Sequence, residues 1–244
     1  MGLRTLFQPR PPASVDLDFG GRAITVAVRV SDRAKNYRLS ISPRHGPVLT
    51  VPRLGRWRDA EAFLSRHAGW LDARLESTGE APRIAHGAII PLRGEDHRII
   101  ALDRARGLVT PTRGIEGAEL HVPGGEAHCR RRLIDWLKTE ARADLEAACA
   151  IHAGTLGVKV AAISLRDQSS RWGSCSSARR LNFNWRLVMA PPFVLDYVAA
   201  HEVAHILEMN HAPVFWRTVG RALPDYEKGR RWLKANGQQL MRIG

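Results

Sequence analysis

The stretch His201-Glu-Val-Ala-His205-Ile-Leu-Glu-Met-Asn-His211 decides the fold of this chain. It combines the HExxH spacing with a third histidine six residues further on. On an α-helix, residues four apart lie about 40° apart around the axis, so His201 and His205 can direct their imidazoles at one metal ion. Three histidine ligands leave a fourth tetrahedral position for water. The stretch therefore predicts a catalytic zinc site, with one Zn²⁺ per chain held by His201, His205 and His211.

Glu202 lies next to these ligands but off the ligand face, where its carboxylate can reach a metal-bound water without competing for the metal. We therefore expect Glu202 to be the catalytic carboxylate. A straight helix would turn His211 to the wrong side, so the chain must bend between His205 and His211. Asn210 is the expected bend, because asparagine tolerates the left-handed conformation that ends helices, and Pro213 cannot continue the helix.

An ordinary buried helix, with its histidines hydrogen-bonded to carbonyl groups, is the alternative interpretation of this stretch. The preceding residues 194–200 are apolar nearly all round, so the helix is expected to be buried, with Pro191 and Pro192 at its start. Buried histidines and a buried glutamate need partners. One zinc ion with its water serves all four groups, whereas the alternative needs several separate partners.

Composition predicts a globular protein without a membrane span. The chain has 244 residues, of which 44% are hydrophobic, enough for a substantial core. It contains no apolar run of about 18 residues, and its first residues lack an apolar signal region. Cys129, Cys149 and Cys175 show no CxxC spacing, which argues against a cysteine-ligated zinc site and fits a reducing compartment. We therefore expect a cytoplasmic location.

The net charge of +13 arises from 37 Lys and Arg against 24 Asp and Glu. Such a surface attracts polyanions, so nucleic acid is a candidate partner. The arginines are scattered, however, and the short clusters at 130–132, 179–180 and 230–231 do not form the long basic block of a nucleic-acid-binding tail. Charges spread over solvated faces are the favoured interpretation.

Hydrophobic patterning predicts an α+β protein with two lobes. Residues 1–14 are expected to form a flexible arm, and residues 15–124 a β-rich lobe with one helix over 58–75. Within that lobe, alternation predicts a small antiparallel sheet from 15–19, 23–30, 37–41 and 48–51. The spacing changes to a helical period at Gly124-Gly125, which marks the expected boundary of a lobe over 125–244. His67 is expected to be a hydrogen-bonded core residue, and no internal repeat is evident.

The C-terminal lobe is expected to begin with a long helix from Glu126 to about Ala153, in which Cys149 is a packing residue, as is Cys129. Strands follow at 158–166 and 182–189. Between them, the polar loop 169–180 contains Trp172, Gly173, Ser174 and Cys175, and we expect it to be the tip of a hairpin close to the metal helix. Two further helices are predicted after Pro213.

Several motifs occur together around the histidine stretch: Arg171-Trp-Gly-Ser-Cys175, Leu181-Asn-Phe-Asn-Trp-Arg-Leu187, Tyr197-Val198, and Asn210-His211 followed by Phe215-Trp216. With these motifs the chain resembles the YgjP-like metallopeptidase family, related to the SprT-like and WLM zinc metalloproteases. The resemblance implies a zincin-like metallopeptidase lobe, zinc at His201, His205 and His211, and Glu202 as the catalytic carboxylate. The spacing from His205 to His211 also equals that of metzincins, but Glu208 replaces their bend-forming glycine.

The leading hypothesis is zinc-dependent hydrolysis of a protein or peptide substrate. Arg171 is the favoured oxyanion-stabilising residue, since Tyr197 and Tyr226 are expected to pack in the helix and the core. Cys175 could instead silence the zinc as a reversible fourth ligand, although a role in shaping the loop is favoured. The competing class is a nucleic-acid-associated protein: a non-catalytic module in which zinc only holds the fold, or a protease recruited to DNA as the related families suggest.

Overall fold

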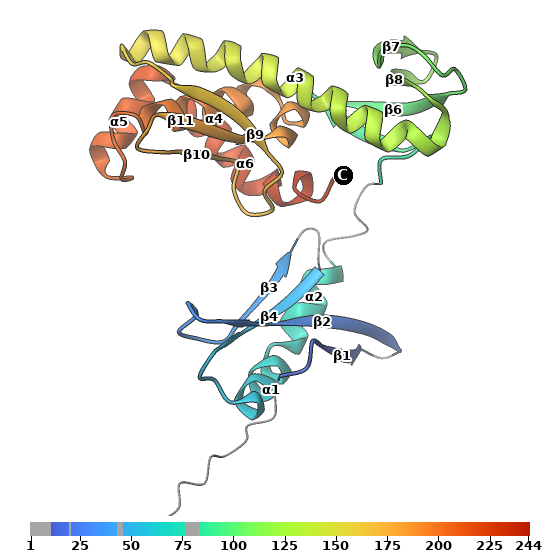
Figure 1. Cartoon of the computed structure of the whole chain (residues 1–244), viewed down its shortest axis with the longest axis vertical. Coiled ribbons are helices and arrows are strands. Elements are labelled where there is room, and N and C mark those ends of the chain that lie inside the picture. Colours follow the sequence, from blue (N-terminus) through green and yellow to red (C-terminus); the bar gives the residue numbers. More distant parts are fainter. Residues whose placement is uncertain (1–10, 20, 43–45, 77–82) are drawn as a thin grey trace, which may run out of the picture. The chain divides into compact units, whose positions relative to one another are not determined.

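The computed structural model of the protein describes residues 11–19, 21–42, 46–76 and 83–244 (Figure 1). The chain divides into two compact units, Met1–Glu80 and Ala81–Gly244, called here the N-terminal and C-terminal units. The described residues form six α-helices and three small sheets, so the predicted α+β class is confirmed. Of the expected N-terminal arm, residues 1–10 lie outside the described residues, and the first strand already begins at Ser14.

The N-terminal unit is a four-stranded sheet followed by two short helices. The strands β1 (Ser14–Phe19), β2 (Arg22–Ser31), β3 (Arg38–Ser42) and β4 (Gly46–Pro52) lie in the order β1-β2-β4-β3. β2 and β4 run parallel, whereas the other two pairs are antiparallel. The sheet is therefore mixed, not antiparallel as predicted. Residue alternation sets which face of each strand is buried, but not the direction of its neighbour.

The expected single helix over 58–75 is two helices, α1 (Trp57–Arg66) and α2 (Ala68–Glu76). They separate at His67, whose φ of −105° and ψ of 6° are not helical. The His67 ring stacks on Phe63 and its Nδ1 lies 2.8 Å from the carbonyl oxygen of Phe63, as expected for a hydrogen-bonded core residue. Both helices contribute to the core of the unit, which contains Val26, Leu49, Val51, Ala60, Leu64 and Leu71.

The C-terminal unit opens with a second four-stranded sheet, formed by β5 (Ile89–Leu92), β6 (Glu95–Leu102), β7 (Thr110–Gly114) and β8 (Gly117–Pro123). The long helix α3 (Gly125–Leu156) follows at once and runs from this sheet to the other end of the unit (Figure 1). Ile99 and Leu120 of the sheet share one core with Leu133 and Leu137 of α3. The domain boundary predicted at Gly124-Gly125 is therefore wrong, because the second sheet packs on the helix that follows it.

The two four-stranded sheets repeat one topology. The order β5-β6-β8-β7, with β6 parallel to β8, matches β1-β2-β4-β3, with β2 parallel to β4. The fourth strands even share a sequence pattern, Gly46-Pro-Val-Leu-Thr-Val-Pro52 and Gly117-Ala-Glu-Leu-His-Val-Pro123. Leu49 and Leu120 occupy equivalent positions and are both fully buried. The expectation that the chain has no internal repeat is therefore wrong at the level of structure.

The rest of the C-terminal unit holds the predicted metal stretch. A three-stranded sheet has the order β10-β11-β9 and consists of β9 (Ala162–Arg166), β10 (Gly173–Cys175) and β11 (Arg180–Asn184). The strand predicted to reach Met189 ends at Asn184 and continues as a 3-10 helix over Trp185–Met189. Helices α4 (Pro192–Ala204), α5 (Pro213–Ala222) and α6 (Tyr226–Leu240) follow, with a proline in the first turn of α4 and of α5. No helix in the described part of the chain has both the length and the apolar character needed to cross a membrane.

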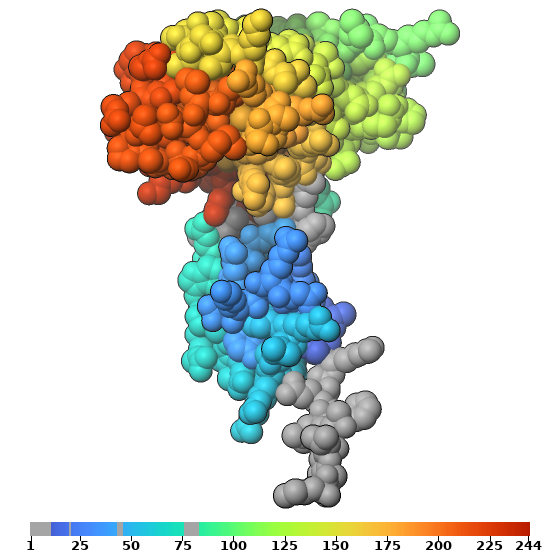
Figure 2. Space-filling model, turned by 60° about the vertical axis from the view of Figure 1, so that its left-hand side comes forward, coloured from blue at the N-terminus to red at the C-terminus, as the bar shows by residue number. Residues whose placement is uncertain are grey.

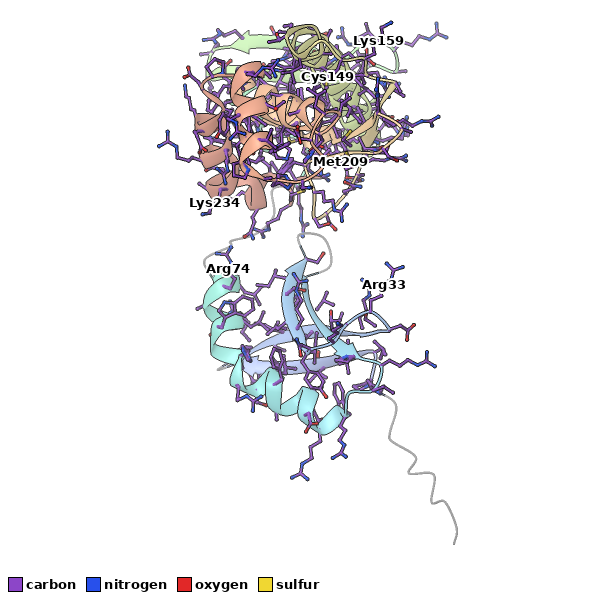
Figure 3. All side chains as sticks on the ribbon, turned by 90° about the vertical axis from the view of Figure 1, so that its left-hand side faces the viewer. Arg33, Arg74, Cys149, Lys159, Met209 and Lys234 are labelled. Atoms are coloured by element: carbon purple, nitrogen blue, oxygen red, sulfur yellow. The ribbon has the colours of Figure 1, made fainter. Side chains whose placement is uncertain are left out.

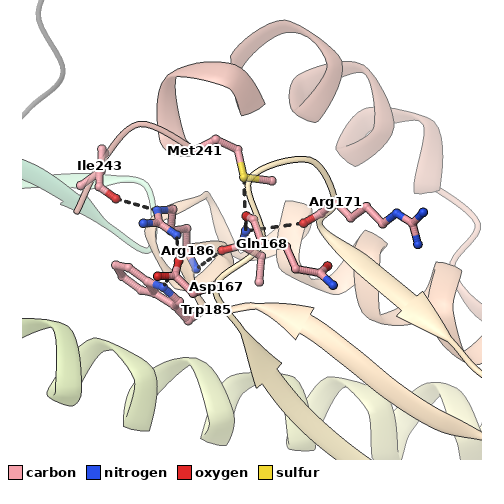
Figure 4. Close-up of polar contacts among 8 residues, drawn as sticks. Asp167, Gln168, Arg171, Trp185, Arg186, Met241 and Ile243 are labelled. Atoms are coloured by element: carbon pink, nitrogen blue, oxygen red, sulfur yellow. Dashed lines mark hydrogen bonds and ion pairs between the residues drawn. The ribbon is translucent and has the colours of Figure 1, made fainter. Parts of the chain in front are cut away.

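A buried arginine ties the end of the chain to the loop before β10. Arg186 is 1% exposed, and its Nε donates a hydrogen bond of 2.6 Å to the carbonyl oxygen of Ile243. Its guanidinium also pairs with Asp167 and lies 4.3 Å from the ring centroid of Trp185, whose Nε1 donates to the same carboxylate (Figure 4). A buried charge needs such partners, so these contacts fix both segments relative to β11.

Candidate metal centre

Helix α4 ends immediately before the second histidine of the stretch. His201 and Glu202 lie in the last turn, Ala204 is the final helical residue, and His205 is the C-cap. Tight turns follow, in which the backbone N–H groups of Leu207 and Glu208 both donate to the carbonyl oxygen of Ala204. The predicted bend between His205 and His211 is therefore present, but it begins before Asn210. The only described non-glycine residues with positive φ are Arg93 and Arg179, so Asn210 does not supply a left-handed bend.

The bend brings three imidazoles together. The Nε2 atom of His201 lies 3.2 Å from Nε2 of His205 and 3.1 Å from Nε2 of His211. All three ligand atoms lie within 4.8 Å of one another. Nδ1 of His205 lies 2.9 Å from the carbonyl oxygen of Glu208. Because a carbonyl can only accept, His205 carries its proton on Nδ1, and its Nε2 lone pair is free to bind a metal.

This arrangement fits a divalent cation. Two nitrogen ligands about 2.0–2.1 Å from a tetrahedral zinc ion are about 3.3 Å apart, close to the observed separations. Burial, together with the charges of His205, His211 and Arg230, lowers the pKa of His201 to about 3. Burial also lowers the pKa of His205. Neutral imidazoles are the form that binds metals, whereas lone pairs this close without a shared cation repel one another.

Aromatic side chains pack against the rings of His201 and His205. His205 stacks on Phe215 with ring centroids 4.4 Å apart, and His201 meets Phe215 edge-on at 4.8 Å. Tyr197 and Trp216 also lie against His201, both at 5.8 Å. The buried Nδ1 of His201 has no hydrogen-bond partner among the described residues. Aromatic packing, and not a second hydrogen bond, therefore orients the His201 ring.

Glu202 is buried beside the triad, with 5% of its surface exposed. Burial raises the pKa of its carboxyl to about 8. The backbone of Gly173, the first residue of β10, lies directly against this side chain. A Cβ on Gly173 would stand 2.4 Å from Oε1 and 2.7 Å from Cδ of Glu202. The predicted proximity of the 169–180 loop to the metal helix is therefore present, and a Cβ at the contact would force the Glu202 side chain to move.

Gly173→Ala is expected to displace the Glu202 carboxylate, because the added methyl group overlaps it. We expect a loss of about 1–3 kcal/mol in the free energy of unfolding and a fall of about 10- to 100-fold in kcat. Urea denaturation and peptide hydrolysis measure the two effects. Gly154→Ala is the matched control, since a Cβ there meets nothing within 4 Å inside α3. Wild-type kcat in Gly173→Ala would contradict the assigned contact.

The side chains of Trp172, Ser174 and Cys175 in the predicted loop make contacts that stabilise the fold. Trp172 packs against both cores of the C-terminal unit and its Nε1 lies close to Gly237 of α6. Ser174 accepts a hydrogen bond from Asn182 on the neighbouring strand. Cys175 is half-buried, its thiol donates to the carbonyl of Ser176, and burial and the charge of Glu202 raise its pKa. Its sulfur is not part of the ligand group, which gives no support to a fourth-ligand role for Cys175.

The candidate oxyanion residues lie in different environments. Arg171 is exposed, and its backbone carbonyl accepts from Asn184 Nδ2, while its guanidinium points away from the Arg186 cluster (Figure 4). Within the described ranges, no hydrogen bond or ion pair joins that guanidinium to Glu202 or the imidazoles. Tyr197 is buried in α4, as expected, and burial raises its pKa to about 12. Tyr226 packs against the core, as expected, and also lines an open pocket next to His211.

Sequence reasoning missed Arg217 and Arg230, which line the same pocket as His211. In the sequence, Arg230 stands out only as part of the short basic cluster 230–231. A usable signal existed, since Tyr226 and Arg230 are four residues apart and therefore share one face of α6. Cys129 and Cys149 are packing residues, as predicted, since each is 1% exposed; Figure 3 labels Cys149 in the C-terminal unit.

One known protein family matches most of this chain. A search of curated proteins finds no match. Among solved structures, the crystal structure of the metallopeptidase zymogen of Pyrococcus abyssi abylysin is similar over 37% of this chain and 93% of that one, with 17% sequence identity and a TM-score of 0.34. The model of the YgjP-like metallopeptidase domain matches residues 35–236, well over half of the sequence. The chain belongs to the YgjP-like metallopeptidase family.

Proposed function

We propose that the protein is a zinc-dependent peptidase that hydrolyses peptide bonds in protein or peptide substrates, with Glu202 as the general base. The observation that carries the proposal is the convergence of three Nε2 atoms beside a buried carboxylate. His201, His205 and His211 would hold one zinc ion. Zinc bound there would polarise the carbonyl group of the scissile bond and would lower the pKa of a coordinated water to about 7.

Residues of the chain would transfer the protons and hold the reacting groups in position. Glu202 accepts the proton of the attacking water and passes it to the leaving amine. A carboxyl whose pKa lies near neutrality is suited to both transfers, and burial raises that of Glu202 in this direction. The Glu208 carbonyl fixes the tautomer of His205 and aims its Nε2. Because Gly173 has no Cβ, the Glu202 carboxylate can lie against the backbone of β10.

Strand β10 offers a place for an extended substrate. It is an edge strand of its three-stranded sheet, so the backbone groups on its outer side face no other strand of that sheet. Peptides commonly bind such an edge by adding a strand. Gly173 begins β10 and touches Glu202, so a peptide paired with β10 would pass beside the catalytic carboxylate.

A purely structural zinc site is less well supported. Structural sites use four protein ligands, whereas the metal-binding group found in the described ranges contains three histidines. Cys175 and Glu202 are not in that group. Recruitment to nucleic acid, suggested by the net charge of +13, stays a prediction.

Removal and return of the metal test the proposal. Protein stripped with a chelator is expected to leave casein and a proteome-derived peptide mixture intact, and one equivalent of zinc per chain is expected to restore cleavage. New amino termini identified by mass spectrometry report hydrolysis. Cleavage by the metal-free protein at the same rate, or no cleavage by the zinc-loaded protein, would reject the proposed function.

A further inference from the structure

A pocket of about 550 Å³ opens beside the third histidine. It is formed by residues of α5 and α6 together with His211. In Figure 2 the surface of the chain that follows α4, coloured dark orange, adjoins that of the β9–β11 segment. The pocket is lined by His211, Pro213, Trp216, Arg217, Tyr226 and Arg230. A group bound in it would therefore be next to the reacting atoms.

The charged side chains of the pocket are arginines. Arg217 is exposed, and no ion pair or hydrogen bond engages its guanidinium within the part of the chain that the structure describes. Arg230 forms an ion pair with Glu227 at 2.8 Å, but both side chains are about half exposed, so this ion pair is weak. A carboxylate of a ligand can therefore replace Glu227 as the partner of Arg230.

Two stacked aromatic side chains position Arg230. Trp216 and Tyr226 stack with ring centroids 5.6 Å apart and an interplanar angle of 19°. The guanidinium of Arg230 lies over Trp216, 4.2 Å from the ring centroid. A guanidinium fixed in this way loses less conformational entropy when it binds a ligand. Arginine is also the side chain best shaped to bind a carboxylate through two parallel hydrogen bonds.

We propose that this pocket receives a carboxylate of the substrate, close to the scissile bond and on the His211 side of the metal centre. The inference rests on the proposed peptidase function and adds a preference for acidic substrates. The carboxylate can come from an Asp or Glu side chain or from the free carboxyl terminus of a peptide. Arg217 and Arg230 are the residues that determine this specificity.

Matched decapeptides distinguish the two sources of the carboxylate. In one set, Glu, Gln or Lys is placed in turn at each position around the cleaved bond. In the other set, the same Gln peptides carry either a free carboxyl terminus or an amide. For the zinc-loaded wild type we expect kcat/KM to be about fivefold higher with Glu than with Gln at one position, the size of one partly exposed ion pair. A preference for the free terminus over the amide would identify the terminal carboxylate as the source.

Charge reversal tests the assigned residues. Arg217→Glu and Arg230→Glu are each expected to abolish the preference for the carboxylate and to favour the Lys peptide. Arg231→Glu changes the same charge at an exposed neighbouring position of α6 that does not line the pocket, and should keep the wild-type preference. Circular dichroism and zinc content show whether each variant keeps its fold and metal.

Binding separates failure of this inference from failure of the proposed function. Fluorescence anisotropy with labelled Glu, Gln and Lys peptides is measured on zinc-loaded Glu202→Gln protein, with and without Arg217→Glu. Tighter binding of the Glu peptide that Arg217→Glu reverses supports the pocket even if the wild type cleaves no peptide. Equal binding and equal kcat/KM for all three peptides, or no peptide binding, would overturn the inference while leaving the zinc site intact.

Discussion

Replacing Glu202 with glutamine is expected to abolish hydrolysis while zinc stays bound. The amide has nearly the shape of the carboxylate but cannot accept the proton of the attacking water. Loss of a general base typically costs about 10²- to 10⁴-fold in rate. Because Glu202 is not part of the histidine ligand group, the zinc content should not change. Initial rates on casein or a fluorogenic peptide, together with elemental analysis, measure both quantities.

The control for this substitution is Glu146→Gln, which makes the same chemical change at a half-exposed position of α3 paired with Arg142. It should hydrolyse substrate at the wild-type rate. A Glu202→Gln protein that turns over substrate as fast as wild type would remove Glu202 from the mechanism. A Glu202→Gln protein that has lost its zinc would show instead that the carboxylate contributes to metal binding.

His211→Ala is expected to release the zinc. His211 follows the bend after α4, and its Nε2 lies 3.1 Å from that of His201, so its loss would leave two ligands. Loss of a group that only orients a ligand already costs about 10- to 100-fold in metal affinity, and loss of a ligand should cost at least about 100-fold. Elemental analysis after dialysis against a competing chelator gives the stoichiometry, with about one zinc per chain expected for the wild type.

His128→Ala is the matched control, because His128 is an exposed histidine of α3 outside the ligand group. It should retain one zinc per chain after the same dialysis. Circular dichroism shows whether His211→Ala keeps its helices, so that metal loss is separated from unfolding. If His211→Ala retained its zinc as tightly as wild type, the three-histidine assignment would be rejected.

The histidine spacing carried most of what could be foreseen about the candidate site. Two imidazoles four residues apart on a helix face one way by geometry alone, and a third ligand beyond the helix required a bend. The position of that bend could not be foreseen. It depends on how the residues after Ala204 hydrogen-bond to the last carbonyls of α4, and these contacts are made without a left-handed Asn210.

Several other errors share one physical origin, which is contact between residues far apart in the sequence. The spacing of Tyr226 and Arg230 places them on one face of α6, but they line the metal pocket only because α6 packs against α4 and contacts Trp216 of α5. The second sheet belongs to the C-terminal unit because Ile99 and Leu120 are buried against α3. The repeated topology of the two sheets was hidden because the pattern common to Gly46–Pro52 and Gly117–Pro123 covers only one strand of each sheet.

The sequence by itself determined the donor atoms, their spacing along α4, the buried character of that helix and the α+β class, because each follows from residue type and local periodicity. Only the tertiary structure decided where the chain divides, which strands run parallel, that Gly173 meets Glu202, and that two arginines stand beside His211. These features depend on burial and close contact between distant segments. Such contacts are fixed when the whole core packs, and not by any one stretch of residues.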